Sequence, residues 1–412
     1  MLALLFLAGS ALAGACAVRR ALRGALAVWE QGLWGTVAGW MLATVLVYAL
    51  ARAQGRLTWA EVAWATVLVW LGAAALLAPS VVRMRRAEVF GWRGRLRESF
   101  RLRNLTRREH VGLAFVLVVF APVYWRLFST HTFAEGAGGV YSGGSAWYDL
   151  SFHAALATSF AYGANFPPAY TPLSGEPLLY PFMPDFHAAA LMAAGLPLRA
   201  ALLSTALPLA LCVNGLFYSF ALRVTRRAGA AALATLLFLL NGGLGFWEFV
   251  RDWRGSGLNL AEFWRTPAVN YANLWERGIH WTNLVADTLL PQRASLYGLP
   301  AALMVFTAFA AFWQRSEPPA VAGGSELLST GPTRETYPTA TAGGSDPAAL
   351  VGGEVTRPSD VRLLLVAGVL AGLLPYFHTH TYVAAGLVSV FLFLLGPRRE
   401  WVAFWAPAVL LA

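Results

Sequence analysis

The sequence predicts an all-α fold: a polytopic bundle of about ten transmembrane helices with an interfacial helical outer loop. Hydrophobic residues make up 58% of the 412 residues and charged residues only 13%, and the mean hydropathy is +0.55. Apolar runs recur along the chain at lengths near the ~20 residues that cross a ~30 Å hydrocarbon core. Short segments rich in Arg, Gly and Pro separate these runs. This composition excludes a water-soluble domain.

The basic residues indicate a membrane surface rather than a nucleic acid. All 31 of them are Arg, they give a net charge of +10, and they lie between the apolar runs. Such a distribution is typical of cytoplasmic loops that face anionic lipid headgroups. The segment Arg83–Arg108 alone holds ten of them, which predicts that it is cytoplasmic. Cys16 and Cys212 lie in apolar runs, which predicts small buried hydrophobes rather than a disulfide or metal site.

The first apolar run, Met1–Ala17, resembles a signal peptide in length. However, no basic residue precedes it, and Arg19, Arg20 and Arg23 follow it. This order predicts a first membrane helix with its N-terminus outside, because positive residues favour the cytoplasmic side.

The other loops can be assigned to a side of the membrane, because each span takes the chain from one side to the other. Two loops, 126–183 and 248–293, fall outside. Segment 184–196 is too short to cross and is broken by Gly195 and Pro197, so we expect a short helix that dips in from outside. If Arg199 instead marks a turn on the cytoplasmic side, every later loop is assigned to the opposite side of the membrane. The expected spans lie near 2–18, 33–51, 61–79, 111–125, 200–222, 229–247, 294–313, 362–376, 381–396 and from 401 onward.

These elements divide into four parts. Residues 1–110 form N-terminal helices with a basic cytoplasmic loop, and 111–315 form a membrane core that carries both outer loops. Residues 316–361 are rich in Gly, Ser, Thr, Pro and Ala, which predicts a disordered cytoplasmic linker. Residues 362–412 form C-terminal helices. The span that begins at Trp401 is too short to cross, so we expect a truncated or split protein.

Ionisable residues gather on the predicted outer side, where the stretches WYDLSFH and GEPLLYPFMPDFH lie. A membrane protein holds few such residues, so a cluster of them is typical of a functional site. The alternative is that polar residues lie outside only because the long loops do. The candidate residues are Asp149, His153, Glu176, Asp185, His187, Arg293, His378 and His380.

Asp149 and His153 are four residues apart in a segment, 146–162, that is apolar enough for a helix along the interface. That spacing puts both side chains on one helix face. A carboxylate there can take a proton from an acceptor hydroxyl or bind a divalent metal. Alternatively, Asp149 stabilises a helix N-terminus and His153 is simply hydrogen-bonded. Asp185, next to Pro184, is either a second acid or metal ligand or another N-terminal stabiliser.

Two further motifs can likewise be explained either by a function or by a purely structural role. Arg293 opens a membrane helix whose N-terminus faces out, and it is either a phosphate ligand or a side chain that extends to lipid headgroups. His378 and His380 form a His-x-His pair that can bind zinc or manganese, or they cap helix ends. The aromatic residues of 246–281 indicate interfacial anchoring or sugar stacking.

Taken together, the carboxylate on an interfacial helix and the following EPLLYPFMPDF motif resemble the GT-C superfamily of polytopic membrane glycosyltransferases. The resemblance covers roughly 111–313. It implies a glycosyltransferase that uses a polyprenyl-phosphate sugar as donor, in a bacterial plasma membrane, as part of cell-envelope synthesis. Asp149 would be the catalytic base or a ligand of Mg or Mn, with Asp185 as a second catalytic carboxylate. Substrate would be bound by His153, Glu176, His187 and Arg293.

The chain departs from that family in two respects. Three apolar helices precede the helix that leads into the outer loop, and no Asp-x-Asp pair is present. Two other classes therefore stay open: a lipid or glycolipid transporter, and a non-catalytic scaffold subunit. A transporter is expected to place polar groups at mid-membrane and to contain repeats. We find no repeat, and only Asn214 and Pro208 interrupt the middle of a span.

Overall fold

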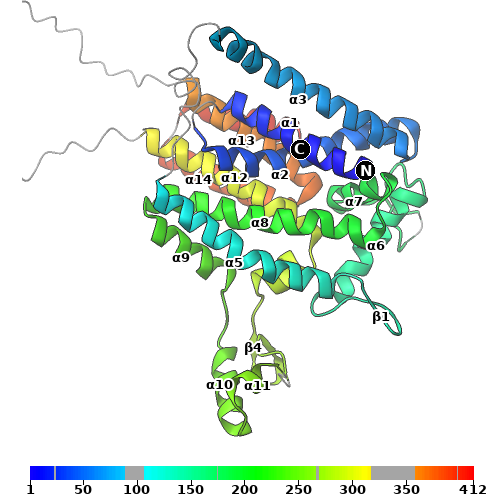
Figure 1. The fold of residues 1–412 in the computed structure, drawn as a ribbon, viewed down its shortest axis with the longest axis vertical. Helices are drawn as coiled ribbons and strands as arrows, with labels where there is room; N and C mark the ends of the chain where they lie inside the picture. The colour runs from blue at the N-terminus through cyan, green and yellow to red at the C-terminus, as the bar shows by residue number, and fades with distance from the viewer. Residues whose placement is uncertain (23–24, 89–105, 174, 266–268, 317–357, 397) are drawn as a thin grey trace, which may run out of the picture.

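The computed structural model describes residues 1–22, 25–88, 106–173, 175–265, 269–316, 358–396 and 398–412. The all-α prediction is confirmed: helices run side by side through the body of the molecule (Figure 1), and the strands among the described residues form only two short antiparallel hairpins. The long helices are α1 (Leu2–Ala21), α2 (Val28–Gln54), α3 (Trp59–Glu88), α5 (Arg107–His131), α8 (Leu198–Thr225), α12 (Arg293–Ser316), α13 (Pro358–Phe377) and α14 (Thr379–Leu395). The shorter elements are β1 (Ala134–Gly136), β2 (Gly139–Tyr141), α6 (Ala146–Tyr162), α7 (Met183–Ala193), α9 (Ala228–Leu239), α10 (Gly245–Ser256), α11 (Leu260–Arg265), β3 (Asn273–Leu274), η1 (Trp275–Arg277), β4 (Ile279–His280), η2 (Leu284–Leu289), η3 (Arg399–Trp401) and α15 (Val402–Leu410).

Six helices in the described part of the chain are long and apolar enough to cross a membrane: α1, α2, α3, α5, α8 and α12. The apolar helices α9, α13 and α14 are shorter. Helices form in every run that the sequence analysis expected to span, although the run 229–247 is helical only in part, and length and composition alone support six spans. Lipid contact along this bundle follows from the same apolar surfaces.

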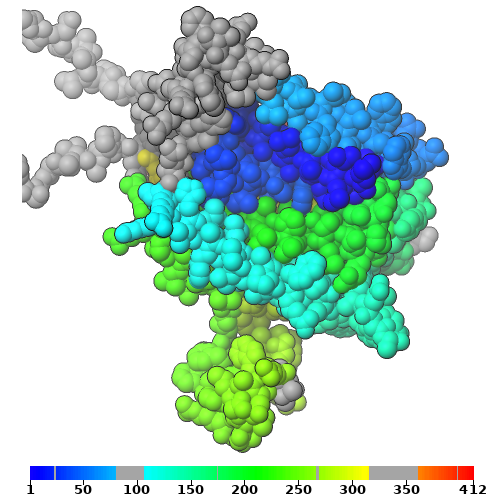
Figure 2. Space-filling view, in the orientation of Figure 1, coloured from blue at the N-terminus to red at the C-terminus, as the bar shows by residue number. Residues whose placement is uncertain are grey.

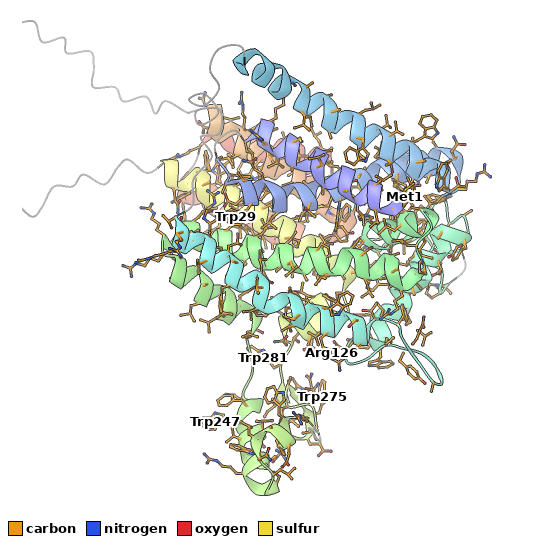
Figure 3. All side chains as sticks on the ribbon, viewed as in Figure 1. Met1, Trp29, Arg126, Trp247, Trp275 and Trp281 are labelled. Carbon is orange, nitrogen blue, oxygen red and sulfur yellow. The ribbon has the colours of Figure 1, made fainter. Side chains whose placement is uncertain are left out.

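The bundle has two ends, and arginines gather at one of them. Met1 lies at one end and Trp29 at the other (Figure 3). The Met1 end carries α6, α7 and the β1–β2 hairpin (Figure 1). The opposite end, which we call the arginine end, holds the α1–α2 connection, the start of α5 and the α8–α9 turn. The basic residues described at this end include Arg19, Arg20, Arg107, Arg108, Arg223, Arg226 and Arg227.

Small residues let α1 pack directly on the backbone of α2. A Cβ added to Gly14 would lie 2.1 Å from the carbonyl oxygen of Gly35, and one added to Gly39 would lie 2.0 Å from that of Ser10. Close backbone approach of this kind is typical of helix pairs inside membranes. The first apolar run is thus part of the packed bundle, as expected for a membrane helix.

The short helix predicted at 184–196 is present as α7, followed after Gly195 and Pro197 by α8. With 11 residues, α7 spans about 16 Å, roughly half of a bilayer core. Arg199, at the start of α8, donates hydrogen bonds to the carbonyl oxygens of Ser129 (2.8 Å) and Thr132 (3.2 Å) at the end of α5. Arg199 therefore lies at the Met1 end, and the alternative in which it marks a turn at the opposite end does not hold.

One predicted helix boundary is wrong. The run 229–247 was expected to be one span, but α9 ends at Leu239. The reason is the Asn241-Gly242-Gly243 sequence, because two glycines cost a helix too much backbone entropy. The chain then leaves the bundle and forms a small lobe of α10, α11 and the β3–β4 hairpin (Figures 1 and 2).

The two segments predicted to be cytoplasmic connections lie mostly outside the described residues. They are the basic loop within Arg83–Arg108, of which 89–105 are not described, and the linker 316–361, of which 317–357 are not described. Both remain predictions. The C-terminal apolar run forms α15, which packs against α13.

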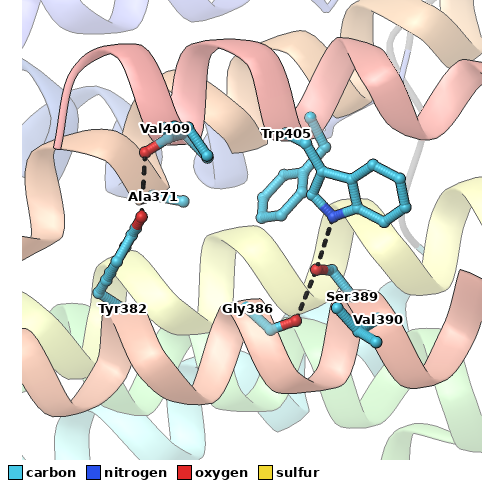
Figure 4. A pocket seen from close by; sticks show the side chains of 9 residues that line it. Ala371, Tyr382, Gly386, Ser389, Val390, Trp405 and Val409 are labelled. Carbon is cyan, nitrogen blue, oxygen red and sulfur yellow. Dashed lines mark hydrogen bonds between the residues drawn. The ribbon is translucent and has the colours of Figure 1, made fainter.

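A small cavity of about 140 Å³ lies between α13, α14 and α15 (Figure 4). The indole of Trp405 donates to Ser389 (3.0 Å), whose hydroxyl donates to the carbonyl oxygen of Gly386 (2.7 Å). The polar atoms at its wall thus bond to one another, and none of the residues that line it is charged. This cavity offers no chemistry.

A buried polar cluster at the Met1 end

The centre of the candidate site is a hydrogen-bonded pair of side chains between α6 and α7. Nδ1 of His153 lies 3.0 Å from each carboxylate oxygen of Asp185. His153 is 2% exposed and Asp185 is fully buried. Phe186, next to Asp185, packs edge-on against Phe160 of α6 with ring centroids 5.3 Å apart. The apolar contacts thus hold two helices in register, and the polar pair lies inside that contact.

The face of α6 explains why His153 points inward. The buried residues of this helix recur at helical spacing, and His153 is one of them: Ala146, Leu150, His153, Leu156, Ala157 and Phe160. A histidine on such a face needs a partner, because a buried polar group without a hydrogen bond costs stability. Asp185 supplies that partner.

A second buried pair joins α7 to α12. Nδ1 of His187 lies 2.6 Å from the hydroxyl of Tyr297, and both side chains are fully buried. The His187 ring meets the rings of Phe6 and Trp40 edge-on, each with centroids 5.8 Å apart. Its Nε2 is buried and has no hydrogen-bond partner among the described residues. Four helices, α1, α2, α7 and α12, therefore converge on this imidazole.

Arg293 is also inside the bundle rather than at a headgroup position. It is 3% exposed. Its guanidinium donates to the carbonyl oxygen of Leu202 (3.1 Å) and to the hydroxyl of Thr205 (2.6 Å), both on α8. The negative charge of Asp185 and the positive charge of Arg293 interact electrostatically. In this structure Arg293 thus ties α12 to α8 and balances a buried carboxylate, and a phosphate could reach it only if those bonds opened.

Asp149 lies at the entrance to this cluster. It is half-buried and sits in the first turn of α6, one helical turn before His153. Asp149 does not cap the helix through a hydrogen bond, because no described backbone N–H donates to its carboxylate. The N-cap residue is Ser145. The hydroxyl of Ser145 donates instead to the carbonyl oxygen of Ala286 (2.5 Å).

Tyr180 connects Asp149 to the buried pair. Burial raises the pKa of the Tyr180 phenol, and the negative charges of Asp185 and Asp149 raise this pKa further. Both carboxylates therefore lie within electrostatic range of one phenol. The Tyr180 ring also contacts His153, with centroids 6.1 Å apart. Four residues from α6, α7 and the preceding loop thus form one site: a half-exposed carboxylate and phenol above a buried His–Asp pair.

The structure does not bring the other predicted residues into this site. The side chain of Glu176 is exposed in the loop before α7, where its carbonyl oxygen accepts from the N–H of Tyr170 (2.8 Å). His378 lies at the α13–α14 turn, where its ring faces the hydroxyls of Ser295 (3.4 Å) and Thr381 (3.2 Å). His380 is exposed.

The described residues do not provide a complete ligand set for the predicted metal ion. Among the described residues, no group of three or more His, Cys, Asp or Glu is arranged to hold a metal ion. The rings of His378 and His380 lie 5.5 Å apart, measured between centroids. Burial and the neighbouring His380 lower the pKa of His378, which favours its neutral form.

The mid-membrane residue Asn214 has a packing role. Its side-chain carbonyl accepts from the hydroxyl of Tyr124 (2.7 Å), and its amide donates to the carbonyl oxygen of Val116 (3.2 Å). Asn214 therefore joins α8 to α5.

The sequence analysis missed two tyrosines that contact the predicted residues. Tyr297 follows Arg293 by four residues, so both lie on one helix face, and that spacing could have identified it. Tyr180 lies within the quoted LLYPF stretch, but aromatic residues are too frequent there to single it out. The pairing of His153 with Asp185 was also not predicted, because it joins residues from separate helices.

No protein-family model matches the chain, and no curated protein or solved structure is significantly similar to it. The function must therefore be argued from the site itself.

Proposed function

We propose that the chain is an integral membrane glycosyltransferase, GT-C-like, which transfers a sugar from a polyprenyl-phosphate donor to an acceptor hydroxyl at the Met1 end. The observation that supports this most is the Asp149 carboxylate: half-buried, without a described hydrogen-bond donor, and one turn from the buried His153–Asp185 pair. A carboxylate kept unpaired at the edge of a membrane bundle is costly unless it has a task.

In the proposed reaction, the acceptor oxygen attacks the anomeric carbon of the sugar. Asp149 takes the acceptor proton as this bond forms. The bond from the anomeric carbon to the phosphate oxygen breaks, and polyprenyl phosphate leaves with the bonding electrons. The Tyr180 hydroxyl, which lies within electrostatic range of Asp149, is a hydrogen-bond donor that can orient the sugar or the acceptor.

The buried residues act by positioning. Asp185 accepts the Nδ1 hydrogen of His153 and so fixes the ring. Arg293 balances the charge of Asp185 from within the bundle. Among the described residues, no group of three or more His, Cys, Asp or Glu gathers at Asp149 to hold a metal ion, so we assign the carboxylate to proton transfer.

On this proposal the Met1 end faces outward and the arginine end faces the cytoplasm, as the positive-inside bias requires. The long helices and the shorter α9, α13 and α14 then cross in alternation, and α15 begins a further span. Local thinning of the bilayer accommodates the three shorter helices. The plasma membrane of a bacterium is the corresponding location.

The test is donor cleavage by the purified full chain in lipid nanodiscs. Polyprenyl-phosphate mannose, glucose and galactose are each supplied with a crude membrane extract as acceptor, and released polyprenyl phosphate is measured. Release that depends on the protein supports the proposal. Flipping of an intact donor across vesicle membranes without cleavage would favour a transporter, and neither activity with any donor would favour a scaffold subunit.

A further inference from the structure

A large cleft at the arginine end has no part in the proposed reaction. It has a volume of about 1000 Å³ and lies between the start of α5 and the α8–α9 turn. In Figure 2 this region is the cyan and green surface at the end of the molecule opposite Met1. The charged residues that line it are Arg107, Arg108, Glu109, Arg226 and Arg227.

The cleft carries excess positive charge. Four guanidinium groups face one carboxylate, and Glu109 already accepts hydrogen bonds from the backbone N–H (2.7 Å) and hydroxyl (3.0 Å) of Thr106 in a capping box. Within the described residues, none of the four guanidinium groups makes a hydrogen bond or ion pair. Four like charges held together by two separate chain segments favour an anion between them.

The backbone adds donors to the same space. The N-cap residue of α9, Arg227, makes no side-chain capping bond. The first residues of this helix, Ala228, Gly229 and Ala230, line the cleft. Their N–H groups and the positive end of the helix dipole favour a negatively charged ligand. A Cβ added to Gly229 would meet no atom within 4 Å, so the space beside it is open.

The rest of the cleft is apolar and continues onto the lipid-facing side of the bundle. Val111 and Phe115 line it and are 61% and 45% exposed. Beyond them, Val118 on α5 and Leu233 and Leu237 on α9 are more than half exposed. An anion site that opens onto an apolar surface fits an amphipathic ligand, whereas a soluble phosphate would use only the basic part.

We infer that this cleft binds an anionic phospholipid, with its phosphate between the four arginines and the start of α9 and its acyl chains along α5 and α9. Basic pockets between membrane helices bind such headgroups by charge. The site lies at the end of the bundle opposite Asp149. The inference therefore does not rest on the proposed function, and either can fail alone.

Binding of phosphatidylglycerol to the purified full chain in detergent, measured by native mass spectrometry and compared with phosphatidylcholine, tests the inference. We expect phosphatidylglycerol to bind preferentially. Arg108→Ala and Arg227→Ala should each weaken this binding about fivefold, the change that corresponds to about 1 kcal/mol per basic residue. Gly229→Glu should weaken it by at least about tenfold, because it places a carboxylate in the open part of the cleft.

Gly255→Glu is the matched control. Gly255 also lies in a helix, α10, and an added Cβ there also meets no atom within 4 Å. It should bind phosphatidylglycerol like the wild type. Equal binding of the two lipids, or equal affinity of Gly229→Glu and the wild type, would overturn the inference. Full competition by soluble glycerol phosphate would show that the ligand is a free phosphate and that the acyl chains contribute nothing.

Discussion

The two ends of the bundle differ in how their charged and polar side chains are placed. At the Met1 end, several ionisable side chains are buried inside the protein and paired, as in His153 with Asp185 and His187 with Tyr297. At the arginine end, most of the basic side chains are exposed and surround an open cleft. Buried pairs need well-defined geometry to offset desolvation, whereas exposed charges need none.

This difference in placement suits the two ends to different functions. A set of buried, mutually fixed groups beneath one free carboxylate suits chemistry, because its members cannot reorganise during a reaction. A set of exposed cations on flexible side chains suits binding of a charged surface or headgroup. Among the described residues of the arginine end, the buried Glu30–Arg223 pair departs from this contrast, and it provides the strongest test.

Arg223→Ala should have the largest effect on stability. Arg223 lies at the arginine end but is buried, and its guanidinium contacts both carboxylate oxygens of Glu30 at 2.9 Å, which joins α8 to α2. Its removal leaves Glu30 as a buried charge without its cation, so we expect a loss of about 3–5 kcal/mol. The free energy of unfolding in mixed detergent micelles measures it.

Arg251→Ala is the matched control for that change. Arg251 pairs with Glu248 in the lobe, but its side chain is 62% exposed. Its removal should cost about 1 kcal/mol or less. Equal losses for Arg223→Ala and Arg251→Ala would show that burial does not distinguish these pairs.

Asp185→Asn should have an intermediate effect. An amide keeps one acceptor oxygen for His153 but loses the charge, so we expect destabilisation by about 1–3 kcal/mol. Combination with His153→Asn should cost less than the sum of the single changes, by at least about 0.5 kcal/mol, because the two residues are in contact. Strict additivity of the free energies would mean that the pair does not contribute as a unit.

His378→Gln should have the smallest effect, visible only in the pH dependence of stability. The lowered pKa of His378 means that the unfolded chain takes up its proton first on acidification. The contribution of this histidine is therefore complete above its unfolded pKa of about 6.5 and is lost as the pH falls toward the folded value. Thermal unfolding between pH 7.5 and 5 should depend less on pH in His378→Gln; an unchanged slope contradicts this.

Much of the fold was predictable from the sequence. Apolar runs of sufficient length identify membrane helices because the bilayer imposes a length, and Gly195 with Pro197 marked the end of α7. The early end of α9 was missed, since a window average of hydropathy outweighs the local effect of Gly242 and Gly243.

The sequence identified most residues of the buried polar cluster, but not the hydrogen bonds that they form with one another. Asp149, His153, Asp185, His187 and Arg293 were singled out because ionisable residues in a membrane protein are few. Their partners were not, because hydrogen bonds between α6 and α7 or between α7 and α12 depend on packing that no local pattern encodes. For the same reason, Arg293 was expected at a phosphate and instead lies bonded to Thr205 on α8.

The central claim is that Asp149, and not the buried charge around it, performs the proton transfer. The most direct measurement is the initial rate of polyprenyl phosphate release by Asp149→Asn, with the donor that the wild type cleaves, beside Glu135→Gln, an exposed carboxylate of β1 at the same end. We predict that Asp149→Asn lowers the rate by about 100-fold or more, that Glu135→Gln keeps it, and that both unfold like the wild type to within about 1 kcal/mol. A wild-type rate in Asp149→Asn would contradict the claim.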